Sequence, residues 1–201
     1  TLFMAMDRWI TDGTSPPRSV HPTLADGTLV GWQAAKAGWT PLPGVTYPTT
    51  IQQPEPVDYG KEFDTTRRID HHPPKRADDR YDVRVPVLDG DNNERGVLRM
   101  PAVSVPVATY TGWNLRNPAI GVPEALLGLA GGYLVFPKTV ADRTATSDPR
   151  RSIEERYVNF ETYVTKVMRA ADTLVLTGYL LEEHLPGIKQ VAESHRPLFA
   201  N

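Results

Sequence analysis

Cysteine is absent from this sequence of 201 residues, which also lacks a marked excess of charge and any long apolar run. Without cysteine, disulfide scaffolds, thiol nucleophiles and cysteine-ligated zinc or iron–sulfur sites are excluded. The net charge is only −2, which argues against a nucleic-acid partner held mainly by phosphate contacts. The longest uncharged stretches, such as 125–137, are too short to cross a bilayer, so we expect no membrane span.

Familiar catalytic motifs are also lacking. The sequence contains no GxSxG nucleophile elbow, no HExxH zinc motif, no SxxK and no glycine-rich phosphate loop. None of the histidines has a serine in a strand–turn–helix context that would make it a general base; they are His21, His71, His72, His184 and His195. From the residues alone we therefore assign no catalytic, cofactor-binding or metal-binding residue.

The composition, with 40% hydrophobic and 23% charged residues, is that of a folded chain. A length of 201 residues is enough for one large domain or two small ones. Apolar residues at helical spacing predict helices near 1–12, 152–177 and 186–196. Ser152, with Glu155 three residues later, forms the sequence pattern of a capping box. The first helix begins on apolar residues without an N-cap, which indicates a chain cut from a longer one.

The segment 14–80 shows no regular periodicity. Five prolines between residues 41 and 56 exclude a helix there. Trp32, Trp39 and Tyr47 nevertheless suggest an irregular segment that packs against a larger body through its aromatic side chains, since a flexible linker would not need them. A proline-rich ligand for another domain is the alternative. Charges of alternating sign over 61–84 favour a solvated surface. Within that surface His71-His72 favours an exposed loop over a metal site.

The clearest strand pattern begins after this charged region. Alternating apolar residues predict a small antiparallel sheet within 81–110, with strands near 81–87, 97–100 and 103–109 joined by a polar turn over 89–96. The turn resembles the first half of a calcium loop, but an EF-hand needs Gly at 94 and Glu at 100, where this chain has Glu94 and Met100. A plain hairpin is therefore favoured over calcium binding. Two short helical turns are expected within 121–132, where glycines indicate close backbone packing.

Three stretches of the sequence carry a family resemblance. They are 6–13 together with 15–19 and 24–30, then Val105-Pro106-Val107-Ala108-Thr109-Tyr110-Thr111-Gly112-Trp113-Asn114-Leu115-Arg116, and 148–157 ending in Ser152-Ile153-Glu154-Glu155-Arg156-Tyr157. In order along nearly the whole chain, these stretches resemble the later part of bacterial α/β-hydrolase domain-containing proteins. The Pro-rich region and 61–80 match only loosely.

The resemblance implies an α+β fold that forms the C-terminal portion of an α/β-hydrolase-type protein. Residues 1–13 would end the last core helix of the hydrolase domain, 14–80 would be irregular and charged, and 81–201 would be a family-specific C-terminal region with strands in 81–110 and helices in 152–196. The apolar face of 152–177 and the tryptophans Trp9, Trp32 and Trp39 would then be buried against the hydrolase core. Because the family's serine, acid and histidine would all precede this chain, no catalytic residue is transferred to it.

The function implied by the resemblance is that of a serine-type hydrolase acting on carboxylic esters. Its partners would be the remainder of the hydrolase chain and a small-molecule ester, with no metal or organic cofactor. The resemblance slightly favours a periplasmic or secreted protein, although the sequence does not give the compartment. A noncatalytic binding or structural module and a degenerate hydrolase that has lost its triad are the alternatives.

Trp113, Asn114 and Arg116 are the candidate substrate-binding residues. In the functional interpretation they lie near the mouth of the active cleft, where the indole forms a flat wall and the two polar side chains orient the substrate. The structural interpretation, which we favour at this point, has Trp113 as a packing residue, Asn114 bonded to the backbone of a turn and Arg116 paired with an acidic neighbour.

Overall fold

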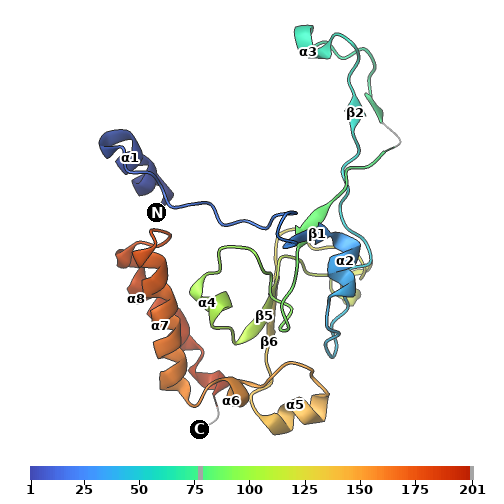
Figure 1. Ribbon diagram of the computed structural model, residues 1–201. Helices are drawn as coiled ribbons and strands as arrows, with labels where there is room; N and C mark the ends of the chain where they lie inside the picture. The colour runs from blue at the N-terminus through green and yellow to red at the C-terminus, as the bar shows by residue number, and fades with distance from the viewer. Residues whose placement is uncertain (77–78, 200–201) are drawn as a thin grey trace.

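The C-terminal third is built around two long helices, α7 (Phe160–Leu176) and α8 (Leu185–Ser194), which pack side by side in the computed structural model (Figure 1). The structure describes residues 1–76 and 79–199. Short helices α5 (Val140–Thr146) and α6 (Ile153–Arg156) precede the pair. Single 3₁₀ turns, η2 (Glu182–His184) and η3 (Arg196–Leu198), flank α8.

The predicted helix 152–177 is interrupted. Ser152 and Glu155 form the expected capping box at the start of α6, but Tyr157 is extended and Asn159 caps a new helix by accepting a hydrogen bond from the Thr162 N–H. Asparagine favours such a cap because its side-chain oxygen satisfies an amide that the first turn leaves unpaired. The predicted helices near 1–12 and 186–196 are confirmed as α1 (Leu2–Asp12) and α8.

The main core lies between the helix pair and the segments beside it. Its fully or nearly buried members come from α6, α7, α8 and the residues next to strands β5 (Ala108–Thr111) and β6 (Gly132–Val135); they are Val107, Phe136, Ile153, Tyr157, Phe160, Tyr163, Val167 and Ala192. The short helix α4 (Pro101–Ser104) packs against α7. The apolar face of α7 is therefore covered by this chain itself, which corrects the expectation that it needs a separate hydrolase core.

The strands form three two-stranded antiparallel sheets: β1 (Leu29–Gly31) with β4 (Arg84–Pro86), β2 (Val57–Asp58) with β3 (Lys75–Arg76), and β5 (Ala108–Thr111) with β6 (Gly132–Val135). An α+β fold with small antiparallel sheets is thus confirmed, but the predicted pairing of 81–87 with 97–100 is wrong. The turn over 89–96 does form, closed by the Asp89 N–H donating to the Asn93 carbonyl.

The predicted strand over 103–109 is also corrected, because residues 101–104 form α4 and only residues 108–111 are a strand. Pro101 occupies the first turn of α4, where its missing N–H costs nothing. No helix forms within the described residues 121–132, and a single 3₁₀ turn, η1 (Pro118–Ile120), lies just before them. Close glycine packing is confirmed, since a Cβ on Gly131 would lie 2.2 Å from the Thr111 carbonyl oxygen.

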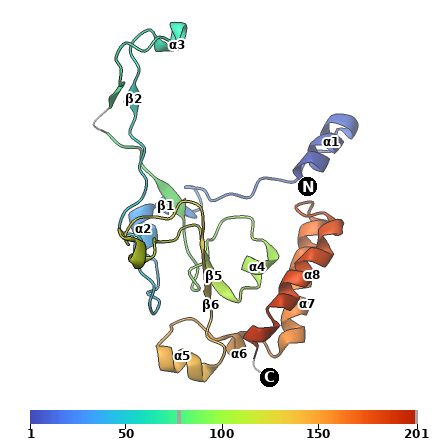
Figure 2. The same ribbon diagram turned by 180° about the vertical axis from the view of Figure 1, so that it is seen from behind.

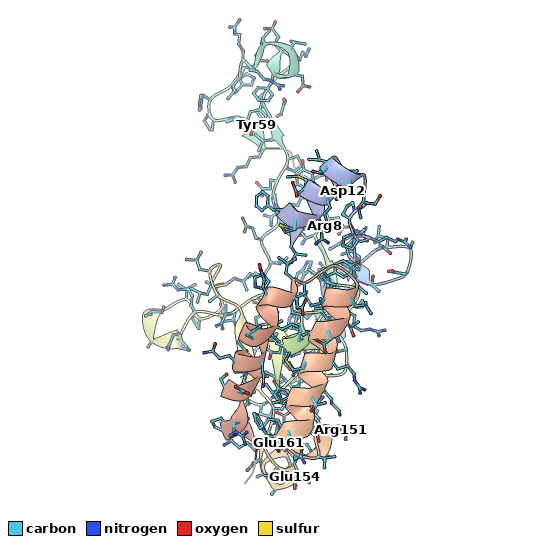
Figure 3. The ribbon with its side chains drawn as sticks, turned by 90° about the vertical axis from the view of Figure 1, so that its left-hand side faces the viewer. Arg8, Asp12, Tyr59, Arg151, Glu154 and Glu161 are labelled. Carbon is cyan, nitrogen blue, oxygen red and sulfur yellow. The ribbon has the colours of Figure 1, made fainter. Side chains whose placement is uncertain are left out.

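Two parts project from this body (Figures 1 and 2). The segment around β2 and α3 (Phe63–Thr66) forms an arm with α3 at its far end, and Figure 3 shows Tyr59 part way along it. Helix α1 lies beyond the ends of α7 and α8, with Arg8 and Asp12 on it. The segment 14–80 is not wholly irregular, since it also contains β1 and α2 (Trp32–Ala37). No helix in the described part of the chain is long and apolar enough to cross a bilayer.

Candidate functional site

Trp113 lies in a cluster of three aromatic rings. Its ring centroid is 5.5 Å from that of Trp39 and 5.3 Å from that of Tyr47, and Trp39 and Tyr47 are themselves 5.2 Å apart. The rings are tilted or edge-on to one another, an arrangement that aromatic quadrupoles favour over face-to-face stacking. Residues from distant parts of the sequence therefore meet at Trp113.

The cluster forms one wall of a cavity of about 110 Å³, which we call the aromatic pocket. Trp32 and Ala35 from α2, Val85 from β4 and Tyr110 from β5 also line it, together with Glu94. The lining is mostly apolar, with few polar groups, as is usual for small-molecule sites. The pocket thus lies where α2 and the sheet β1–β4 meet the start of the Trp113 loop.

Asn92 and Asn93 hold the walls of the pocket in place. Both side chains are buried: the Asn92 amide exchanges two hydrogen bonds with the Thr40 backbone, at 2.9 and 2.8 Å. The Asn93 amide bonds both the Ala108 carbonyl and the Tyr110 N–H of β5. Adjacent residues of one turn thus fix the segment behind Trp39 and the strand that leads to Trp113.

Glu94 and Trp32, which line the aromatic pocket, each have a polar group without a partner within the described residues. The Nε1–H of Trp32 is buried without a hydrogen bond. The carboxylate of Glu94 makes neither an ion pair nor a hydrogen bond there, and burial raises its pKa. Burial, and then the nearby charge of Glu94, raise the pKa of the Tyr47 phenol. A partly buried carboxylate without a partner is costly unless a ligand or water completes it.

The other side of Trp113 faces an open groove of about 450 Å³, which we call the groove. Asn114 and Arg116 both line it, so the structure brings the three candidate substrate-binding residues together. The Asn114 side chain accepts a hydrogen bond from the Leu115 N–H, as the structural interpretation expects. The Arg116 side chain, in contrast, forms no ion pair with any described acidic residue, although Glu124 lines the same groove.

The remaining residues of the aromatic pocket were not assigned to a site from the sequence. The sequence predicts only that Trp32, Trp39 and Tyr47 pack an irregular segment against the rest of the protein. Trp39 is buried in the structure. Trp9, expected to be buried only against a hydrolase core, is 56% exposed here. Nothing in the sequence marks Glu94 as a site residue, because a single acidic residue in a polar turn cannot be distinguished from any other solvated turn residue.

Histidines form no nucleophile–base pair in the described part of the chain. His195 Nδ1 and the hydroxyl of buried Tyr163 share a hydrogen bond of 2.7 Å, and burial lowers the pKa of His195. His71 and His72 are exposed, as the loop interpretation predicts. No group of three potential metal-ligating side chains comes together within residues 1–76 and 79–199.

The calcium-like turn uses its carboxylates within the protein. Asp89 accepts hydrogen bonds from the backbone N–H groups of Asp91 and Asn93, at 2.9 and 3.0 Å, and its second oxygen pairs with Arg99. Asp91 pairs with the guanidinium of Arg156. The acidic residues of the turn therefore stabilise the fold through these contacts, which agrees with the hairpin interpretation.

Comparison with known families gives one match. The profile of the family described as "Alpha/beta hydrolase domain" matches residues 1–190, which is nearly the whole chain. Neither the curated proteins nor the solved structures contain a significant match. This coverage agrees with the resemblance carried by the Trp113 segment. The chain therefore belongs to the alpha/beta hydrolase domain family.

Proposed function

We propose that this chain is part of a serine-type hydrolase that acts on carboxylic esters, with its catalytic triad supplied by residues outside 1–201. Family membership over residues 1–190 supports the hydrolase class. The placement of the triad rests on the chemistry of acyl transfer, which needs a serine, a histidine and an oxyanion hole in mutual contact. No serine hydroxyl is hydrogen-bonded to a histidine among the described residues, so this chain is not proposed to hold that constellation.

The role proposed for this chain is to wall the substrate cleft. The observation that carries this proposal is that Trp113 lines both the aromatic pocket and the groove. A ligand can lie against the indole while Asn114 and Arg116, at the same groove, supply polar contacts. A guanidinium that forms no ion pair with the described acidic residues can bind a carbonyl or carboxylate oxygen.

The proposed partner is the remainder of the hydrolase chain. Helix α1 has no buried residue, and it exposes Leu2, Phe3 and Ile10 by 86, 83 and 76% of their surfaces. Apolar side chains gathered on one helix in this way are typical of a surface that another part of a protein covers. Burial of this face would hold the body of this chain against the hydrolase domain.

A fluorophosphonate probe tests the proposal on the full-length protein. The chain has six serines: Ser15, Ser19, Ser104, Ser147, Ser152 and Ser194. We expect covalent labelling of a serine outside this set, found by peptide mapping, together with hydrolysis of p-nitrophenyl esters. Labelling of one of the six would contradict the placement of the triad.

A noncatalytic binding module is the second candidate, and the aromatic pocket is the observation that favours it. Absence of both probe labelling and ester hydrolysis in the full-length protein would reject the serine hydrolase. It would leave the binding module, or a hydrolase that has lost its triad, as the function.

A further inference from the structure

The aromatic pocket combines an unpaired carboxylate with three aromatic rings, and no contact within the described residues neutralises that carboxylate. Glu94 brings a carboxylate into a cavity whose walls are mostly apolar, and no described cation pairs with it. Its Oε1 lies close to the Gly112 backbone, 3.9 Å from where a Cβ on that glycine would be, and its charge reaches the Tyr47 phenol. The carboxylate is therefore positioned beside the aromatic cluster, next to Trp113.

Other acidic side chains with little exposed surface are paired with arginine. Asp89 binds Arg99 at 2.7 Å, Asp148 binds Arg150 at 2.7 Å, and Asp91 binds Arg156. A partly buried carboxylate without a cation is costly, and the cost falls when a cation enters. The contrast between Glu94 and these paired carboxylates points to a positive ligand group.

The aromatic rings define what else the ligand must have. Centroid distances of 5.2–5.5 Å place the three rings in direct contact, so no ion fits between them. The rings instead form a continuous wall that suits alkyl groups and the face-on approach of an ammonium. The cavity of about 110 Å³ limits the ligand to a few non-hydrogen atoms.

The unpaired charge and the apolar walls together define the ligand. We propose that the aromatic pocket binds a small organic ammonium ion with a short apolar part, such as an alkylammonium or an amino ether. The ammonium group pairs with Glu94, and the alkyl part lies on the aromatic wall.

Calorimetric titration of the full-length protein with matched small molecules tests this proposal. 2-Methoxyethylammonium is the probe, and 2-methoxyethanol is its neutral counterpart of nearly equal shape. With the wild-type protein at constant ionic strength, we expect the alcohol to bind about tenfold or more weakly, which corresponds to one ion pair in a partly buried site. Equal binding of the two, or no binding of the ammonium, would overturn the proposal without any variant.

Variants then assign the contacts. Glu94→Gln should remove the preference for the ammonium, while Glu124→Gln, in the neighbouring groove, should leave it unchanged. An equal loss in both variants would mean only a general charge effect and would overturn the site. Binding of 2-methoxyethanol to Glu94→Gln, at the wild-type affinity, shows that the pocket is still folded.

The apolar part of the ligand has its own comparison. n-Butylammonium, which replaces the ether oxygen of the probe by a methylene, should bind at least as well as 2-methoxyethylammonium, because the aromatic wall contacts the alkyl chain. Absence of n-butylammonium binding would overturn the contact with the aromatic wall. Because every readout is binding, failure of the ester hydrolase proposal would leave these results unaffected.

Discussion

Asn92 binds the backbone of Thr40 as a neighbouring strand would. Its side-chain nitrogen donates to the Thr40 carbonyl at 2.8 Å and its oxygen accepts from the Thr40 N–H at 2.9 Å, across 52 residues of sequence. Asn92 is buried and has a backbone φ of 61°, a left-handed conformation that asparagine tolerates better than most residues. One residue therefore closes a turn and fixes the segment that carries Trp39.

The first prediction tests this relationship. Asn92→Ala should lower the free energy of unfolding by about 2–4 kcal/mol, since it leaves two buried backbone groups of Thr40 unpaired and strains a left-handed residue. Asn92→Gly removes the strain but not the loss of hydrogen bonds, so it should recover part of that energy. Chemical denaturation measures both. Asn117→Ala, on an exposed turn, is the control and should change stability by about 1 kcal/mol or less.

The second prediction concerns Arg150, whose side chain is 5% exposed. Its guanidinium binds Asp148 at 2.7 Å, Thr109 at 3.0 Å and the Leu134 carbonyl at 2.8 Å, which joins the β5–β6 sheet to the chain before α6. Arg150→Met should cost about 3–5 kcal/mol, because it leaves the carboxylate of Asp148 buried and unpaired.

Denaturation of a double variant separates the charge from the packing. Arg150→Met combined with Asp148→Asn should be less destabilised than Arg150→Met alone. Arg169→Met, on the exposed side of α7, should change stability by less than about 0.5 kcal/mol. A destabilisation of Arg150→Met as small as that of this control would show that the buried pair does not hold the sheet.

The third prediction is a dependence of stability on pH through His195. Burial lowers the pKa of this histidine in the folded protein, so below the unfolded value of about 6.5 the unfolded state takes up the proton first. The stability of the His195–Tyr163 pair is therefore complete above about pH 7 and is lost as the pH falls.

Thermal melting at about pH 7.5 and pH 5.5 measures this effect. The melting temperature of the wild-type protein should fall more between these two values than that of His195→Asn, which has no group that titrates there. His184→Asn, at a half-exposed position, should behave like the wild type. Equal pH dependence in His195→Asn and the wild type would contradict the prediction.

The fourth prediction concerns the groove and follows from the proposed hydrolase. Because Arg116 pairs with no described acidic residue, its replacement should affect substrate more than stability. Arg116→Lys should lower kcat/KM of the full-length enzyme by tenfold or more, about 1.4 kcal/mol, at an unchanged melting temperature. Asn114→Ala removes both a turn contact and a polar group of the groove, so it should lower the melting temperature as well as kcat/KM. Unchanged kinetics for Arg116→Lys would remove it from the substrate site.

The fifth prediction concerns the exposed face of α1. If the remainder of the hydrolase chain covers this face, Ile10→Asp should destabilise the full-length protein by about 2 kcal/mol or more, since it buries a charge in an apolar contact. Leu129→Asp provides the comparison, because Leu129 is 99% exposed in a loop. Similar, small effects of both substitutions would mean that α1 faces solvent.

Local features of this protein follow from the sequence alone. The apolar stripe of α7, the capping box of Ser152 and Glu155, and the polar turn after Leu88 were all predictable. Each depends on residues only a few positions apart, because helix hydrogen bonds, caps and tight turns close within one or two turns of chain. The family resemblance of the Trp113 segment is of the same kind, since a motif is read directly from consecutive residues.

Tertiary structure decided the rest. β4 could have paired with any strand of suitable pattern, and its partner β1 lies more than 50 residues earlier. The aromatic pocket likewise joins Trp32, Glu94 and Trp113, which no local pattern connects. Strand partners and cavity walls are chosen by the summed packing and hydrogen bonding of the whole chain. Whether Glu94 is paired with a cation is therefore a property of the fold, and the sequence around residue 94 does not contain it.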